Sequence, residues 1–155
     1  MELLDLLKKN HFTVTTAESC TGGMVAARLV DIPGISSYFE EGYITYSNRV
    51  KTKVLGVPEE TITQFGVVSV ETAIAMAKGA CRTSGATCAI ATTGVAGPDG
   101  GTPETPVGCV CFGCVVNGKS FSECIVFSGN RKEIREQATE YAITLLTEKI
   151  REVSL

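Results

Sequence analysis

The stretch that decides the fold is SVETAIAMAKGACRTSGATCAIATTG, residues 69–94. Its first part predicts an amphipathic helix, because Ser69 is a good N-cap, Glu71 falls in the first turn, and small apolar residues recur three and four positions apart. Its last nine residues are nearly all apolar, which is typical of a strand at the buried centre of a sheet. A helix that leads into such a strand favours a sheet with helices packed on it.

Helical and strand patterns also alternate before this stretch. The expected elements are a helix over residues 3–10, a strand over 11–16, a helix over 22–32, a strand over 42–47 and a short helix over 48–57. In the last of these helices we expect Asn48 as the N-cap and Gly56 as the C-cap.

The pattern after residue 94 is different. Residues 107–129 predict two strands joined at Asn117-Gly118, which is the strongest short hairpin signal, and residues 130–153 predict a long amphipathic helix. With 155 residues, 44% of them hydrophobic, the chain is long enough for one continuous core. We therefore expect a single domain, residues 1–155, of the three-layer α/β/α class with a mixed sheet.

Charge and hydropathy restrict the partners. The net charge of −3 gives no overall basic field for nucleic acid or an anionic membrane, and no apolar stretch reaches membrane-spanning length. The first ten residues, MELLDLLKKN, have an acid at the second position and lysines after the apolar run, the reverse of a secretory signal. We expect a cytoplasmic protein with neither a nucleic acid nor a membrane as partner.

The seven cysteines are expected to be thiols that pack as small hydrophobic residues. The segment CVCFGC places Cys109 and Cys111 on one face of a strand and Cys114 on the other. A zinc site would need a second pair of ligands, and the single histidine, His11, is far away in the sequence. We expect no metal and no organic cofactor.

The first candidate site is the loop Glu18-Ser19-Cys20-Thr21-Gly22-Gly23, after the first predicted strand. If Ser19 lies at the next helix's N-terminus, free backbone N–H groups from Cys20 to Gly22 could stabilise an alkoxide or an oxyanion. The alternative is an ordinary cap, because serine and threonine are common there. Cys20 is a second candidate nucleophile, since helix N-termini lower the pKa of thiols.

The second candidate site is Tyr46-Ser47-Asn48-Arg49-Val50-Lys51. Tyr46 is expected to end a strand, and Lys51 to lie in the first turn of the following helix. A partly desolvated lysine beside Arg49 is shifted toward its neutral form and can take the proton of a serine. The alternative, a solvated surface lysine, is the better interpretation of Lys53.

The third candidate site is the glycine-rich loop TTGVAGPDGGTPETPVG, residues 92–108. Its backbone N–H groups could converge on an anion such as a phosphate, and Arg131 could add a bidentate contact. The loop matches neither GxxxxGK[ST] nor GxGxxG, which excludes an ordinary ATPase or dinucleotide site.

Five segments in order, TTAESCTGG, YSNRVKTKVLGV, GVVSVETA, TTGVAGPDGGTPETPVG and FSGNRKEIREQA, resemble the CinA C-terminal domain family over residues 2–150. The resemblance implies hydrolysis of the carboxamide of nicotinamide mononucleotide (NMN) to nicotinate mononucleotide and ammonia, in pyridine-nucleotide salvage. It implies Ser19 as nucleophile, assisted by Lys51 and Tyr46. The substrate-binding residues expected around them are Cys20, Thr21, Gly22, Asn48, Thr93, Gly94, Gly97, Thr102 and Arg131.

Two positions depart from the family pattern. Many relatives have serine where this chain has Thr93, and aspartate where it has Asn130. The alternative function is a non-catalytic nucleotide-binding regulatory module linked to competence or the DNA-damage response, for which Lys51 and Tyr46 would be dispensable. A self-associating chain is also expected, because a small sheet with an exposed hairpin leaves apolar surface to cover.

Overall fold

The computed structural model describes residues 2–155. Its core is one five-stranded sheet of order β2-β1-β3-β4-β5. The strands are β1 (Val14–Glu18), β2 (Tyr43–Ile44), β3 (Cys88–Gly94), β4 (Cys109–Val116) and β5 (Lys119–Val126). β1 runs parallel to β2 and β3, whereas β3, β4 and β5 are antiparallel to one another in turn, so the mixed sheet is confirmed.

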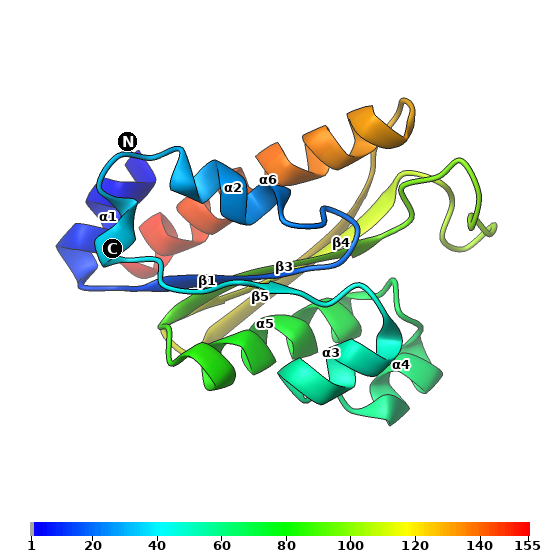
Figure 1. Ribbon diagram of the computed structural model, residues 1–155, viewed down its shortest axis with the longest axis horizontal. Coiled ribbons are helices and arrows are strands. Elements are labelled where there is room, and N and C mark those ends of the chain that lie inside the picture. The colour runs from blue at the N-terminus through cyan, green and yellow to red at the C-terminus, as the bar shows by residue number, and fades with distance from the viewer. Residues whose placement is uncertain (1) are drawn as a thin grey trace.

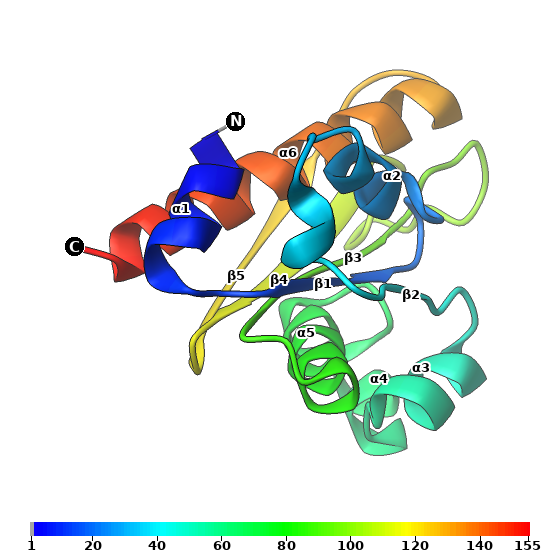
Figure 2. The same cartoon turned by 60° about the vertical axis from the view of Figure 1, so that its left-hand side comes forward.

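Helices cover both faces of the sheet, which confirms the three-layer class (Figure 1). On one face lie α1 (Glu2–Asn10), α2 (Met24–Val30) and α6 (Arg131–Val153), with the short 3₁₀ helix η1 (Ile35–Ser37) nearby. On the other face lie α3 (Asn48–Leu55), α4 (Glu59–Phe65) and α5 (Val70–Ser84), and Figure 2 shows the two layers separated by the sheet.

The central strand β3 has a different composition on each face. Ile90 packs into the cluster under α1, α2 and α6, whereas Ala89 and Ala91 face α5. Since alanines project little, α5 can approach the sheet closely. A β-carbon at Gly113 of β4 would lie 2.2 Å from the carbonyl oxygen of Ala73 in α5.

A second close approach, between α5 and the end of α3, yields a stability prediction. A β-carbon at Gly79 would lie 1.9 Å from the carbonyl oxygen of Leu55. Alanine gains about 1 kcal/mol over glycine in helix propensity, but overpacking against backbone costs about 1–3 kcal/mol or more. We expect Gly79→Ala to lower the free energy of unfolding by about 1–2 kcal/mol in urea titrations. The control Lys78→Ala, at an exposed neighbour, should change it by less than about 0.5 kcal/mol. A Gly79→Ala chain as stable as the parent would contradict this packing.

Several predicted boundaries are wrong. Ser47, not Asn48, caps α3, because its side chain accepts the Val50 N–H at 3.2 Å, while Gly56 is the C-cap as predicted. β2 is only two residues long, so Tyr46 lies beyond the strand instead of ending it. The helix expected over 22–32 is shorter, and α4 was not predicted because its short sequence EETITQF buries no residue fully.

The hairpin turn at Asn117-Gly118 is confirmed, with both residues at positive φ. Cys111 of β4 and Cys124 of β5 are directly opposite each other and form a disulfide, with their Cα atoms 4.0 Å apart. The expectation that all seven cysteines are thiols is therefore wrong for this pair, whose register on adjacent strands the sequence spacing did not reveal. β5 is an open edge of the sheet, and self-association stays a prediction.

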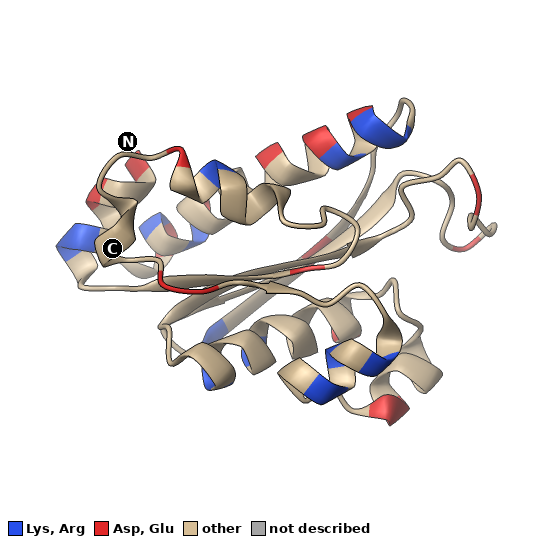
Figure 3. Ribbon diagram, viewed as in Figure 1, with Lys and Arg blue, Asp and Glu red and all other residues tan. Residues whose placement is uncertain are grey.

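Charges are distributed over both layers. In Figure 3 acidic and basic residues alternate along α6, while α3 and α5 carry mainly basic residues. Among residues 2–155, no helix is long and apolar enough to span a bilayer. Within the same range, no cluster of three or more His, Cys, Asp or Glu side chains could hold a metal ion.

Candidate active site

A cleft of about 450 Å³ opens at the carboxyl ends of the parallel strands β1 and β3. Ligand sites in open α/β sheets commonly lie at this edge. The cleft is lined by Ser19, Cys20, Tyr46, Asn48, Lys51, residues 65–68, Thr93, Gly94, Val95, Ala96, Gly97, Asp99, Gly100, Thr105 and Arg131. Parts of all three candidate loops therefore meet in one cleft.

Ser19 and Lys51 are in direct contact in this cleft. The Nζ of Lys51 lies 3.1 Å from the Oγ of Ser19, although 32 positions separate them in the chain. Ser19 is fixed from β1, because its N–H donates to the carbonyl oxygen of Thr92 in β3 at 3.0 Å. Lys51 comes from the first turn of α3, and its side chain is only 1% exposed. The sheet edge and one short helix thus form a buried hydroxyl–amine pair.

Burial changes the protonation of this lysine. It lowers the pKa of Lys51 from 10.5 to about 8, because an ammonium group loses more hydration than a neutral amine does, and a weaker interaction with Cys20 acts in the opposite direction. The sequence attributed the shift partly to Arg49, but this residue is exposed and is not a cause of the shift. A usable fraction of Lys51 is therefore a neutral amine near neutral pH.

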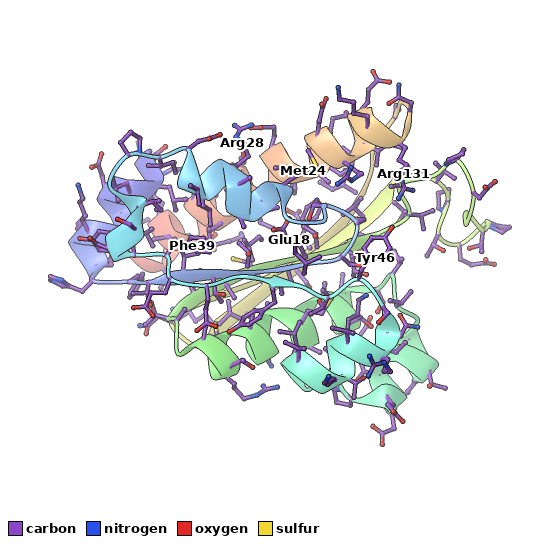
Figure 4. All side chains as sticks on the ribbon, viewed as in Figure 1. Glu18, Met24, Arg28, Phe39, Tyr46 and Arg131 are labelled. Carbon is purple, nitrogen blue, oxygen red and sulfur yellow. A yellow bond between two sulfur atoms is a disulfide. The ribbon has the colours of Figure 1, made fainter. Side chains whose placement is uncertain are left out.

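The phenol of Tyr46 does not lie where the sequence suggested. It is 61% exposed, and its hydroxyl accepts a hydrogen bond from the guanidinium of Arg131 at 3.1 Å. Only the main-chain carbonyl of Tyr46 meets the amine, accepting from the Nζ of Lys51 at 3.2 Å. Figure 4 shows Tyr46 and Arg131 near each other at the same end of the molecule. Tyr46 thus orients the lysine through its backbone and the arginine through its hydroxyl.

Cys20 is a poor nucleophile in this position. Burial raises the pKa of its thiol from 9.0 to about 11, and this effect exceeds the opposing influence of Arg135. The reason given for a reactive thiol, a helix N-terminus, is also missing, since α2 begins only at Met24. The geometry therefore favours the hydroxyl of Ser19 over the neighbouring thiol.

The turn after Ser19 is organised by Glu18, a residue that the sequence reasoning did not assign a role. Its buried carboxylate accepts the N–H groups of Val25 and Ala26 at 2.8 and 3.0 Å, so it caps α2 from inside the sheet. The first-turn donors of α2 are therefore not free for Ser19, contrary to expectation. A carboxylate at the end of a strand, seven residues before an uncapped helix, is the signal that could have identified this role.

Two residues expected to bind substrate belong instead to this turn. The Thr21 hydroxyl is fully buried between Glu18 and Thr92, at 2.6 and 2.8 Å, and does not line the cleft. The Gly22 N–H donates to the carbonyl oxygen of Ser19 at 3.0 Å and is already satisfied. Both residues shape the backbone that carries the nucleophile rather than contacting the cavity.

The glycine-rich loop forms the opposite wall of the cleft. Gly94 and Gly97 line the cavity, and Arg131 donates to the carbonyl oxygen of Gly97 at 2.7 Å, which ties the loop to the start of α6. Thr93 also lines the cleft, with its hydroxyl donating to the carbonyl of Val67 at 2.8 Å. Thr102 is exposed, bonds to Thr105 and does not line the cleft, so its contact with substrate stays a prediction.

An apolar wall was not predicted. Phe65, at the end of α4, and Val67 and Val68, in the segment that follows, line the cleft. Phe65 keeps 46% of its surface exposed, although it is a large apolar side chain. The hydrophobic pattern of the sequence does not predict this wall, because it does not predict α4. Val67 and Val68 lie in GVVSVETA, one of the segments that carry the family resemblance.

The fold and this cleft define a class of protein, a three-layer α/β/α domain with a lysine-paired serine at the carboxyl edge of its parallel strands. The protein-family model of the CinA C-terminal domain matches the sequence of residues 1–150. The chain belongs to the CinA C-terminal domain family.

Individual relatives agree with this assignment. A CinA-like protein of Kosmotoga olearia is 48% identical over 141 residues, which are 91% of this chain and 34% of that protein. A CinA-like protein of Chloroherpeton thalassium is 47% identical over 148 residues, 93% of this chain and 35% of that one. This chain thus spans about a third of the length of these curated relatives.

Among solved structures, a competence-damaged protein (CinA) superfamily protein from Klebsiella pneumoniae 700603 is 34% identical and superposes with a TM-score of 0.92. The match covers 97% of this chain and 94% of the Klebsiella chain. The three-layer fold is therefore shared over nearly the whole chain.

Proposed function

We propose that this protein is an amidohydrolase that removes ammonia from the carboxamide of NMN and leaves nicotinate mononucleotide. The observation that carries the proposal is the buried contact of 3.1 Å between the Ser19 hydroxyl and the Lys51 amine, whose pKa is about 8. Serine–lysine pairs of this kind generate a nucleophile without histidine or metal.

The first half of the reaction forms an ester on Ser19. The neutral amine of Lys51 takes the hydroxyl proton while Oγ bonds to the carboxamide carbon, and the carbonyl oxygen becomes an oxyanion. Lys51 then gives its proton to the amide nitrogen, the carbon–nitrogen bond breaks, and ammonia leaves. The Tyr46 carbonyl, 3.2 Å from Nζ, keeps the amine directed at Ser19 throughout.

The second half returns the enzyme to its starting state. Water bonds to the ester carbon, and Lys51 accepts one of its protons. The bond from carbon to Ser19 Oγ then breaks, the serine regains its proton from Lys51, and the acid product gives its remaining proton to the released ammonia or to water and leaves as a carboxylate. Lys51 serves as base and then acid in each half, so one titrating group is sufficient for the cycle.

The walls of the cleft match the two ends of this substrate. The side chains of Phe65, Val67 and Val68 offer an apolar surface for a flat pyridine ring. Arg131 and the loop around Gly97 and Gly100 offer a cation and main-chain groups for a phosphate. An amide-bearing nucleotide therefore fits better than a free amide or a peptide.

The apolar wall gives a prediction for substrate affinity. Replacing Phe65 by Ala should raise KM for NMN about 5- to 12-fold and lower kcat by less than about threefold, because stacking contributes about 1–1.5 kcal/mol to binding and does not take part in the proton transfer. Steady-state ammonia release measures both constants. The KM of Phe65→Leu, which keeps an apolar side chain, should lie between those of the parent and Phe65→Ala. An unchanged KM in Phe65→Ala would mean that the pyridine ring of NMN does not bind against Phe65.

The function itself is tested by ammonia release from a panel of NMN, its riboside and the dinucleotide, with product identification by mass spectrometry. We expect nicotinate mononucleotide as product and the fastest turnover with NMN. Calorimetric binding of NMN without any ammonia release would instead favour the regulatory nucleotide-binding module, and neither binding nor turnover would reject both functions.

A further inference from the structure

The side chain of Arg135 forms hydrogen bonds with the turn that follows Ser19 and does not line the cleft. It lies near the start of α6, half-buried, and its Nε donates to the carbonyl oxygen of Cys20 at 2.9 Å. One terminal nitrogen donates to the carbonyl oxygen of Thr21 at 3.2 Å. Arg135 is absent from the cleft lining, so its polar contacts are with the two carbonyls that immediately follow the proposed nucleophile.

These contacts fix the direction of backbone donors. In a trans peptide unit the carbonyl and the following N–H point in opposite directions, so holding the Cys20 carbonyl toward α6 directs the Thr21 N–H away from α6. The Ser19 carbonyl accepts from the Gly22 N–H at 3.0 Å, so the Cys20 N–H of the same peptide unit points away from Gly22. Within residues 2–155, neither the Cys20 nor the Thr21 N–H donates to a protein acceptor. Of the two residues only Cys20 lines the cleft, so the Cys20 N–H is the donor next to Ser19 that remains for an oxyanion.

The turn is held from the opposite side as well. Glu18 accepts the Thr21 hydroxyl at 2.6 Å and caps α2, which anchors the turn to β1. Gly22 adopts a φ of 56°, and a β-carbon there would lie 3.2 Å from a terminal nitrogen of Arg135. The guanidinium therefore packs directly on the turn and closes it from the α6 side.

We infer that Arg135 is a positioning residue, whose two hydrogen bonds to the Cys20 and Thr21 carbonyls hold the turn after Ser19 in the conformation that presents the Cys20 N–H to the oxyanion. The inference rests on the proposed function of Ser19. A planar guanidinium can hold two neighbouring carbonyls at once, whereas a lysine ammonium at the same place is a point donor with a shorter reach.

The test compares Arg135→Met, Arg135→Lys and the control Arg151→Met, an arginine of the same helix that pairs with Glu2 far from the cleft. We expect Arg135→Met to lower kcat for NMN about 10- to 100-fold, less than the complete loss of an oxyanion donor, with KM changed by less than about threefold. Arg135→Lys should recover part of the loss, and Arg151→Met should match the parent. The midpoint of the pH–rate profile should stay near the Lys51 value in all of them.

Loss of folding is separated from loss of positioning by urea titration of each variant. A kcat deficit that equals the unfolded fraction, a rise in KM at constant kcat, or a kcat within twofold of the parent would each overturn the inference.

Labelling of Ser19 by a fluorophosphonate, followed by mass spectrometry, does not depend on the substrate. If the parent chain labels but does not deamidate NMN, the proposed function fails, and a tenfold slower labelling of Arg135→Met still supports the positioning role. A parent chain that neither labels nor turns over contradicts both.

Discussion

Replacing Ser19 by Ala is expected to lower kcat for NMN deamidation by about 10⁴-fold or more, because the variant has no oxygen that can form the ester intermediate. Binding of NMN should persist, since the ring and phosphate contacts proposed above do not involve the hydroxyl. The free energy of unfolding should change by no more than about 1 kcal/mol, the usual contribution of one neutral hydrogen bond. Ammonia release, calorimetry and urea titration measure the three quantities.

Cys20 provides the matched comparison. Cys20→Ala keeps the backbone N–H at this position and removes only a thiol whose pKa burial raises to about 11. We expect it to retain at least about a tenth of the parent activity. If Cys20→Ala were inactive while Ser19→Ala stayed active, the two neighbours would exchange roles and the mechanism proposed here would be wrong.

The second large effect is expected at Lys51, where activity and stability should change in opposite directions. Lys51→Met has a similar volume but cannot accept the Ser19 proton, so kcat should fall at least about 10³-fold. At pH 7 the parent chain carries the cost of burying an ammonium group, which the methionine variant does not. We therefore expect Lys51→Met to be about 1–2 kcal/mol more stable at pH 7, after allowing for the lost hydrogen bonds.

The direction of the Lys51 pKa shift determines how this stability difference changes with pH. The pKa of Lys51 is lowered from 10.5 to about 8 on folding, so between these values the unfolded chain binds a proton that the folded chain does not. The stability of the parent relative to Lys51→Met should therefore rise by about 3 kcal/mol as the pH increases from 8 to 10.5. Urea titrations of both chains at pH 7 and pH 10 measure this difference. A constant difference would mean that Lys51 titrates as an ordinary lysine.

The same lowered pKa predicts the rate profile. Only the neutral amine can accept the serine proton, so kcat/KM should rise about tenfold per pH unit below 8 and level off above it. Lys53→Met, an exposed lysine two residues along α3, should show the parent profile and the parent rate. A rate that is flat from pH 6 to 9 would contradict a titrating base at position 51.

Much of this fold follows from local sequence patterns. The apolar run that became β3, the Asn117-Gly118 turn and the caps at Ser69 and Gly56 are all local features, and each has the predicted place in the structure. The sequence did not reveal features that depend on tertiary contacts. The pairing of Cys111 with Cys124 needs the register of two strands, and α4 has neither length nor a buried stripe.

In the candidate site, too, local features were predictable from the sequence and tertiary contacts were not. The sequence indicated a serine, a lysine and a glycine-rich loop at strand ends, and the structure brings Ser19 and Lys51 to within 3.1 Å. It could not show that Glu18 caps a helix seven residues away or that the Tyr46 hydroxyl contacts Arg131, 85 positions along the chain. Those contacts are decided by the direction in which a side chain leaves the sheet edge, which spacing alone does not encode.

The proposed chemistry depends most on Lys51 being a largely desolvated amine, and an NMR titration of lysine side chains tests this directly. With ¹³C-labelled lysine, the Cε signal of Lys51 is identified by its absence from the Lys51→Met chain and followed from pH 6 to 12. We expect a titration midpoint near pH 8 for this signal. A midpoint near 10.5 would contradict a desolvated amine at position 51.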